Sequence, residues 1–224
     1  MSDPSCHHEA TPTPALPGRP QLVLAGNPNV GKTTLFNALT GLSAKVSNYP
    51  GITVETARGE LALGSGRVAD LHDLPGTYST NARSAEEQIA LDALIGLDGQ
   101  TAPDAVIVCL DATQVARAAY LLLQIQELGA RCVVALTMVD EAKTATPDPA
   151  ALSKLLGCDV VAVTARTKSG LPDLVAAIDR AMRSDRAVVR RWEPSTVLRE
   201  HLDRVRAAVP EAWIRTPLAA DALA

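Results

Sequence analysis

One stretch of the sequence has the residue types and spacing that hold a polyphosphate: a G-x-x-x-x-G-K-T loop over residues 26–33. Its glycines let the main chain approach phosphate oxygens closely, so that successive backbone N–H groups surround them. Lys32 is spaced to reach the outer phosphates, and the Thr33 hydroxyl to hold Mg²⁺. A helical pattern over 32–40 would add its positive dipole end to the same site. The loop therefore predicts a nucleotide site made of Gly26, Asn27, Pro28, Asn29, Val30, Gly31, Lys32, Thr33 and Thr34.

Two further segments have the residues that surround the terminal phosphate and its metal ion. The D-x-x-G motif Asp73-Leu74-Pro75-Gly76 would place a carboxylate in the outer shell of Mg²⁺ and the Gly76 amide beside the γ-phosphate. Between this motif and the phosphate loop lies Gly51-Ile52-Thr53, whose threonine would close on Mg²⁺ only in the triphosphate state. The candidate catalytic residues of these motifs are therefore Lys32, Thr53 and Gly76.

Two later loops have the order and spacing of base-recognition loops. The apolar run 132–136 leads into Thr137-Met138-Val139-Asp140, and the run 160–163 leads into Thr164-Ala165-Arg166. The Asp140 carboxylate would accept hydrogen bonds from the N1 and N2 donors of guanine, and the Ala165 amide would face O6. Motifs of this kind in this order predict a GTPase domain.

The elements between the motifs predict an α/β fold: the P-loop small-GTPase fold, a mostly parallel six-stranded sheet with helices on both faces and a short C-terminal helical appendage. The expected strands are 21–25, 54–62, 67–72, 105–110, 131–136 and 159–163. The expected helices are 32–40, 84–95, 113–128, 148–156 and 170–183, the third capped by Thr113 and ended by Gly129. Strands 54–62 and 67–72 should form an antiparallel hairpin at the sheet edge. All the motifs then lie at the carboxyl ends of strands.

Composition divides the chain into three parts. Residues 1–20 are polar and Pro-rich and should be a disordered tail, 21–184 form the GTPase domain, and 185–224 form a helical region that belongs to a truncated helical domain. An apolar stripe from Leu198 to Val209 predicts an amphipathic helix ended by proline, which either packs on the GTPase core or forms a separate subdomain. Cys6-His7-His8 in the tail is either a soft-metal site or a set of mobile side chains.

The overall composition bounds the class of protein. With 224 residues and 47% hydrophobic content, the chain can bury one substantial core plus an appendage. A net charge of −4 gives no reason to expect a nucleic-acid partner. The sequence has neither a run of ~20 apolar residues nor a signal peptide. The cysteines form no C-x-x-C pair and are expected to be reduced core thiols of a cytoplasmic protein.

Three stretches resemble the N-terminal cytoplasmic domain of FeoB, the prokaryotic ferrous iron transport protein B: 26–37, 48–55 and 73–79, the last reading D-L-P-G-T-Y-S. The similarity extends over about 21–184. It implies a GTPase domain at the cytoplasmic face of the inner membrane, followed by a helical domain and coupled in cis or trans to a membrane permease for Fe²⁺. A homo-oligomer is compatible with the sequence.

Several positions qualify the expected chemistry. Thr137 stands where the family has asparagine, which should weaken guanine selectivity, and Thr77 stands where Ras-like enzymes have a water-orienting glutamine, which implies slow hydrolysis. In the wider group that the loop resembles, an asparagine at the position of Asn29 helps to hold K⁺, and this resemblance makes Asn29 a further catalytic candidate; otherwise Asn29 shapes the turn. Arg58 and Arg83 are alternative cations. His72, beside Asp73, is either a base or strand packing.

Two other functions fit parts of the pattern. A soluble assembly GTPase of the Era or MnmE type shares the asparagine-containing loop, although the acidic balance counts against an RNA partner. A guanine-nucleotide sensor with negligible turnover would be consistent with Thr77 and Thr137.

Overall fold

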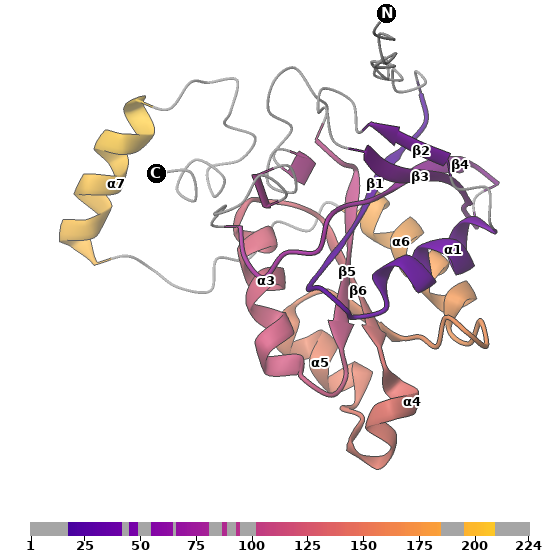
Figure 1. The fold of residues 1–224 in the computed structure, drawn as a ribbon. Coiled ribbons are helices and arrows are strands. Elements are labelled where there is room, and N and C mark those ends of the chain that lie inside the picture. The colour runs from indigo at the N-terminus through magenta and orange to yellow at the C-terminus, as the bar shows by residue number, and fades with distance from the viewer. Residues whose placement is uncertain are drawn as a thin grey trace, which may run out of the picture.

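The computed structural model describes residues 18–41, 45–48, 55–64, 66–80, 87–88, 93–94, 102–184 and 195–208. Its centre is a seven-stranded sheet in the order β2-β3-β4-β1-β5-β6-β7 (Figure 1). The strands are β1 (Gln21–Gly26), β2 (Lys45–Asn48), β3 (Glu55–Ala62), β4 (Val68–Asp73), β5 (Ala105–Asp111), β6 (Cys132–Thr137) and β7 (Asp159–Ala162). From β4 to β7 every pairing is parallel, and only the pairings of β3 with β2 and β4 are antiparallel.

The mostly parallel α/β fold is confirmed, with one difference at the sheet edge. The six expected strands are all present, and β3 and β4 form the expected antiparallel hairpin. This hairpin is not at the edge, however, because β2 pairs with β3 and forms the edge itself. The β2 sequence Lys-Val-Ser-Asn has a single apolar residue, so it shows neither an apolar run nor the alternation by which a strand is recognised in a sequence.

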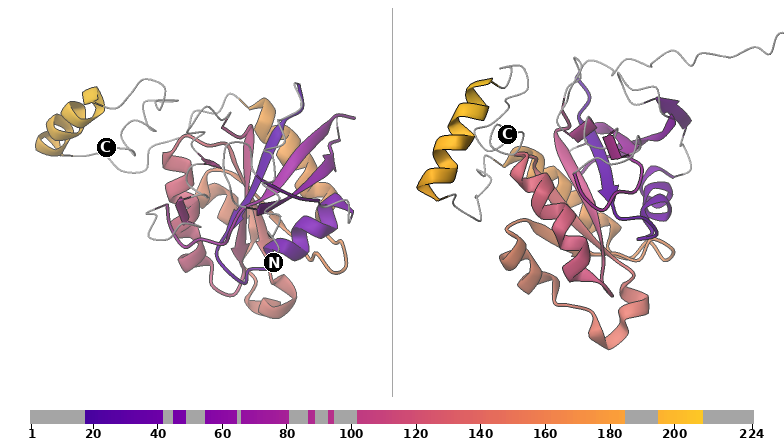
Figure 2. Two further views of the ribbon diagram at one scale, coloured as in Figure 1. Left: turned by 45° about the horizontal axis from the view of Figure 1, so that its top comes forward. Right: turned by 60° about the vertical axis from the view of Figure 1, so that its left-hand side comes forward.

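Helices cover both faces of the sheet, as the two views in Figure 2 show. The helices α1 (Lys32–Thr40) and α6 (Leu171–Arg183) pack on one face, and α3 (Val115–Glu127) and α5 (Pro149–Leu156) on the other. Alternate β1 side chains enter the two cores: Leu22 and Leu24 face α1 and α6, whereas Val23 and Ala25 face α3 and α5. A strand that is apolar on both faces is typical of a central parallel strand.

Two details of the helices differ from the expectation. The N-cap of α3 is Gln114, not Thr113. The Thr113 amide and hydroxyl both donate to the Asp111 carboxylate, at 2.8 and 2.6 Å, which forms a local turn that competes with capping. Two short helices, α4 (Val139–Ala142) and η1 (Lys143–Ala145), were not expected.

Other expected helices are confirmed where the structure describes them. Gly129, at φ +78°, follows Leu128, the C-cap of α3, so the expected glycine stop is confirmed. Of the expected helix 84–95, only residues 87–88 and 93–94 are described, and both pairs are helical. Residues 1–17, with the candidate metal ligands Cys6-His7-His8, lie outside the described residues.

The three described cysteines, Cys109, Cys132 and Cys158, are buried in the core and form no disulfide with one another, as expected for reduced thiols. Burial raises the pKa of the Cys109 thiol to about 12, so the thiol is protonated and unreactive.

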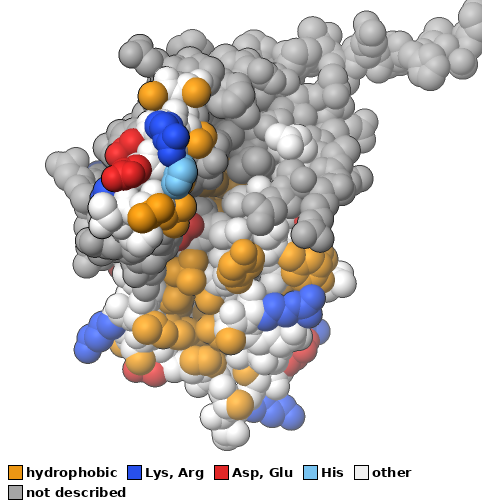
Figure 3. Space-filling model, turned by 90° about the vertical axis from the view of Figure 1, so that its left-hand side faces the viewer, with side chains coloured by type: hydrophobic (Ala, Val, Ile, Leu, Met, Phe, Trp, Pro, Cys, Tyr) orange, Lys and Arg blue, Asp and Glu red, His pale blue; other side chains and the backbone are white. Residues whose placement is uncertain are grey.

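The C-terminal helix α7 (Thr196–Ala208) confirms the amphipathic helix expected before Pro210. Its Val197, Leu198 and Val205 side chains are exposed. Figure 3 shows the face that carries α7, with other hydrophobic side chains gathered below it. Among the described residues, no helix has the length and apolar character needed to cross a bilayer.

The start of α6 provides a stability prediction. Gly170 has φ +76°, and a Cβ atom there would lie 2.1 Å from the Ala162 carbonyl oxygen at the end of β7. Gly170→Ala should therefore lower the free energy of unfolding by about 2–5 kcal/mol, from left-handed strain together with overpacking. Chemical denaturation measures the loss.

Gly41→Ala is the matched control for this substitution. Gly41 also has a left-handed φ, of +62°, but nothing lies within 4 Å of the added Cβ. Its substitution should cost only about 1–2 kcal/mol. Equal losses at the two positions would refute the contact with the Ala162 carbonyl as the cause.

Candidate nucleotide-binding site

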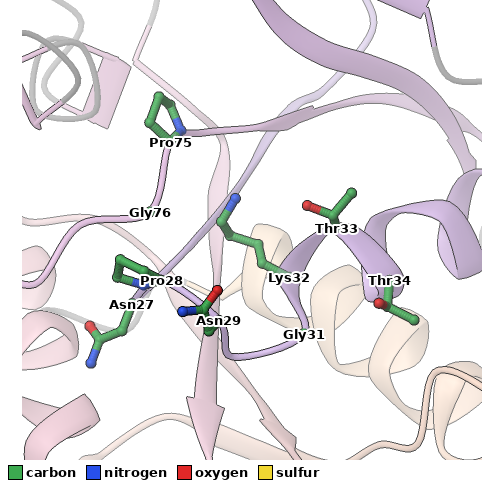
Figure 4. Close-up of a pocket in the computed structure, with 9 residues that line it drawn as sticks. All are labelled: Asn27, Pro28, Asn29, Gly31, Lys32, Thr33, Thr34, Pro75 and Gly76. Carbon is green, nitrogen blue, oxygen red and sulfur yellow. The ribbon is translucent and has the colours of Figure 1, made fainter.

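The phosphate loop connects β1 directly to α1 at the carboxyl end of the sheet. Asn29 and Gly31 both have left-handed backbones, with φ +63° and +78°, and these turn the chain back before Lys32 begins the helix. Glycine and asparagine are the residues that adopt this conformation most readily. The loop borders a pocket of about 460 Å³, within the range of small-ligand sites. Its lining residues are Asn27, Pro28, Asn29, Gly31, Lys32, Thr33, Thr34, Pro75 and Gly76 (Figure 4).

The loop and the D-x-x-G motif converge, although about forty residues separate them in the chain. The Lys32 ammonium contacts the Asp73 carboxylate and the Leu74 carbonyl oxygen. The Thr33 hydroxyl lies 3.2 Å from the second oxygen of Asp73. A hydroxyl and a carboxylate brought together in this way are the oxygen donors that Mg²⁺ prefers, so these residues fit that ion.

Backbone contacts fix the segment after Asp73 against the loop. The Leu74 amide donates to the Leu24 carbonyl and the Thr77 amide to the Gly26 carbonyl, both at 3.1 Å. A Cβ on Gly76 would lie 3.0 Å from the Pro28 backbone, so a larger residue would push the two segments apart. The main chain of Gly76 is therefore held close to the phosphate loop.

Two side chains near this segment, Thr77 and His72, are buried and bonded within the protein, which does not support a catalytic role for either. Thr77 is buried, and its hydroxyl donates to the Ser79 carbonyl at 2.7 Å. His72 lies inside the sheet with its Nε2 3.3 Å from the Gln21 Oε1. Burial, assisted by the nearby Arg58 charge, lowers the pKa of His72 to about 4. His72 is thus a neutral packing residue, and the alternative of a base is not supported.

The alternative cations and the switch segment can also be placed. The Arg58 guanidinium pairs with the buried Asp70 carboxylate at 2.8 Å, which commits its charge elsewhere. Arg83 and the segment Gly51-Ile52-Thr53 lie outside the described residues, so the switch threonine stays a prediction.

At the base-recognition end, Thr137 has a structural partner that the sequence did not reveal. Its buried hydroxyl lies 2.8 Å from the Val30 carbonyl of the phosphate loop and 3.1 Å from the Leu110 carbonyl. A hydroxyl has one proton to donate, and these carbonyls both compete for it. Thr137 therefore ties β6 to the phosphate loop.

The two base loops meet through a charged pair. Met138, at φ +54°, precedes α4, which carries Asp140, and Arg166 donates to the Asp140 carboxylate at 2.9 Å. Thr164, Ala165 and Arg166 lie in a closed turn in which the Thr164 amide donates to the Ser169 carbonyl at 3.1 Å. The Arg166 hydrogen bond lowers the pKa of Asp140, so that the carboxylate is ionised.

Two residues support the loop in ways that the sequence did not show, since Asn27 was expected only as a member of the loop and Cys109 only as a core thiol. Cys109, at the end of β5, lies behind the loop, where a Cβ on Gly26 would be 3.0 Å from the Cys109 Cβ. Asn27 is buried, and within the described residues its Oδ1 has no hydrogen-bond partner. A buried, unsatisfied acceptor at the pocket wall is a place where a water or ligand donor would bond.

Among the described residues, no group of three or more His, Cys, Asp or Glu side chains is arranged to hold a metal ion.

The site consists of a strand, a G-x-x-x-x-G-K-T loop and a helix, and a D-x-x-G motif meets this loop at the edge of a mostly parallel sheet. This arrangement defines a GTP-binding P-loop domain. The FeoB_N family model, described as ferrous iron transport protein B, matches residues 20–178. The chain belongs to this family.

Individual relatives agree with the family match. The Fe(2+) transporter FeoB of Legionella pneumophila (strain Paris) is 44% identical over 158 residues, which are 68% of this chain and 20% of the relative. The same transporter of Salmonella typhimurium is 44% identical over 168 residues, which are 72% of this chain and 21% of the relative. The chain thus spans about a fifth of the length of these relatives.

Solved structures agree over more of the chain. The cytosolic domain of L. pneumophila FeoB superimposes with a TM-score of 0.76 at 36% identity, over 90% of this chain and 78% of that one. The cytosolic domain of the T. maritima FeoB iron transporter in its GMPPNP form gives a TM-score of 0.77 at 35% identity, over 91% of this chain and 79% of that one.

Proposed function

We propose that this chain binds and slowly hydrolyses GTP, and that it is the regulatory domain of a FeoB-type ferrous iron transporter. The observation that carries the hydrolytic part is the convergence of Lys32 and Thr33 with Asp73 at the mouth of the phosphate-loop pocket. These are the groups that phosphoryl transfer requires around the terminal phosphates.

Each residue has a role in this proposal. Lys32 exchanges its Asp73 and Leu74 partners for the outer phosphates, and the loop amides of residues 26–34 surround them. Thr33, Asp73 and the switch threonine Thr53 would hold Mg²⁺, which supplies positive charge to the phosphates when bound. The Gly76 amide would donate to the γ-phosphate, and the close approach of Gly76 to the Pro28 backbone supports this role because it holds this main chain beside the phosphate loop.

The slow rate follows from Thr77. Ras-like enzymes orient the attacking water with a glutamine next to this glycine, whereas the Thr77 hydroxyl is buried and bonded to Ser79. Turnover would then depend on a positive charge that is supplied from elsewhere and stabilises the transition state. Asn29, exposed at the pocket, is the side chain that would hold K⁺ for this purpose.

The transporter context is supported by the relatives, which are Fe(2+) transporters about five times the length of the aligned region. In this context the domain lies at the cytoplasmic face of the inner membrane. It couples its nucleotide state to a permease, in cis or trans, that carries Fe²⁺. Family membership counts against the Era or MnmE type of assembly GTPase.

The test is hydrolysis and binding of GTP against ATP by the purified chain. GTP should be hydrolysed slowly and bound in preference to ATP, because Asp140 matches the guanine donors and adenine lacks the N1 proton. Binding of GTP with no turnover in potassium or sodium salts would support the nucleotide-sensor alternative, and equal binding of ATP would refute the base assignment.

The same titrations on Thr137→Asn measure how much nucleotide affinity is lost because this chain has threonine where the family has asparagine. An asparagine amide has two protons, so it can keep the Val30 carbonyl and still donate to the base, whereas the threonine hydroxyl cannot. GDP and GTP should bind several-fold more tightly, since one hydrogen bond contributes about 0.5–1.5 kcal/mol, and the preference over ATP should widen. Unchanged affinities would show that the base is held differently.

A further inference from the structure

The base-binding end of the site carries an ion pair that guanine recognition does not need. Arg166 Nη2 donates to Asp140 Oδ2 at 2.9 Å. The Arg166 side chain is 74% exposed and that of Asp140 is 39% exposed. The arginine can therefore leave this carboxylate with little loss of packing.

Both partners lie on segments that backbone hydrogen bonds hold in place. Arg166 lies in the turn between β7 and α6, where the Thr164 amide bonds to the Ser169 carbonyl at 3.1 Å and the Lys168 amide to the Ala165 carbonyl at 3.3 Å. Asp140 lies in the first turn of α4. The meeting of these side chains thus follows from the geometry of the two loops.

Arginine and guanine offer the same chemistry to a carboxylate. A guanidinium presents parallel N–H donors in a planar fork, and the N1 and N2 protons of guanine present a similar pair of donors. Adenine has no such pair at this edge. Guanine would use both oxygens of this carboxylate, including the Oδ2 that Arg166 uses, so the two donors compete for the lone pairs of that oxygen.

We propose that Arg166 regulates the base site by competing with guanine for the Asp140 carboxylate, and so weakens guanine binding and speeds nucleotide release. This inference rests on the proposed assignment of Asp140 to the base. It makes Arg166 an affinity-determining residue whose effect is confined to guanine nucleotides.

The experiment compares Arg166→Gln with Arg180→Gln in the full chain. Arg180 is a matched control because it makes an ion pair of the same length, 2.9 Å to Asp159, at similar exposure and outside the site. Equilibrium affinities for GDP and ADP, and release of a fluorescent GDP analogue, are measured at low and high ionic strength.

Arg166→Gln should bind GDP about two- to five-fold more tightly and release it correspondingly more slowly, the range that exposed ion pairs contribute. ADP affinity and the Arg180→Gln variant should not change. The difference from the unmutated chain should shrink at high ionic strength, because salt screens an exposed pair. The GDP affinity of Arg166→Lys should lie between those of the unmutated chain and Arg166→Gln, since lysine keeps the charge but not the planar fork of donors.

Unchanged or weaker GDP binding by Arg166→Gln would overturn the inference. Asp140→Asn separates this failure from failure of the base assignment. If Asp140→Asn weakens GDP binding while Arg166→Gln does not strengthen it, competition alone is wrong. If Asp140→Asn leaves GDP binding unchanged, the base assignment is wrong, and the competition proposal with it.

Discussion

Lys32→Ala is expected to weaken Mg-GTP binding on the order of 100-fold or more. In the proposed site the ammonium meets the outer phosphates, and hydrogen bonds to charged groups contribute about 1.5–3 kcal/mol each. Its contacts with the Asp73 carboxylate and the Leu74 carbonyl show that it lies where the phosphate loop meets the D-x-x-G motif. Isothermal titration calorimetry with GTP in excess Mg²⁺ measures the loss.

Removing Lys32 also leaves the Asp73 carboxylate, whose side chain is only 9% exposed, without its oppositely charged partner, so the fold must be checked in the same samples. Thr33→Ala provides the second variant, because the Thr33 side chain is exposed and its loss would remove a proposed Mg²⁺ ligand while keeping the lysine. Thr33→Ala should lose the part of GTP affinity that depends on Mg²⁺. Unchanged GTP affinity in a folded Lys32→Ala protein would remove the basis of the site assignment.

The parts of the fold that the sequence predicted well are those with strong local signals. The bounds of α1 agree with the expected 32–40, because a glycine stands at each end and apolar residues recur at helical spacing between them. The central strands were found because a strand buried on both faces is a continuous apolar run. The phosphate loop and the D-x-x-G motif were recognised by spacing alone, and the structure brings them together.

What the sequence did not predict depends on partners distant in the chain. The Thr137 hydroxyl could be judged only as a poor substitute for an amide until the Val30 carbonyl, over a hundred residues away, was placed beside it. Arg166 was expected only as part of a base loop, and its pairing with Asp140 depends on how two turns face each other. The edge strand β2 is defined by its pairing with β3 and not by its own composition.

The structure supports two roles for Asn29, and it indicates which substitution distinguishes them. Its φ of +63° supports the turn-shaping role, because asparagine tolerates this conformation better than most residues. Its exposed carboxamide at the pocket supports the role of a cation ligand. Asn29→Ala would remove the ligand and also strain the turn by about 1–2 kcal/mol, so it cannot distinguish the two. Asn29→Gly removes only the carboxamide, because glycine adopts the same φ without strain.

GTP hydrolysis should be faster in potassium than in sodium salts, and Asn29→Gly should lose that difference while it keeps nucleotide affinity. A cation held by Asn29 beside the β–γ bridging oxygen would stabilise charge that develops only in the transition state, so its loss lowers turnover more than binding. Arginine fingers, which supply such charge in other GTPases, contribute on the order of 10³-fold or more, and this sets the scale of the expected effect. Single-turnover hydrolysis in matched KCl and NaCl buffers, with GDP titrations alongside, measures both quantities.

If Asn29 only shapes the loop, Asn29→Gly will keep its full response to potassium, and Asn29→Ala will lower binding and turnover equally in both salts. Equal rates for the unmutated protein in the two salts would rule out potassium activation and favour the nucleotide-sensor interpretation.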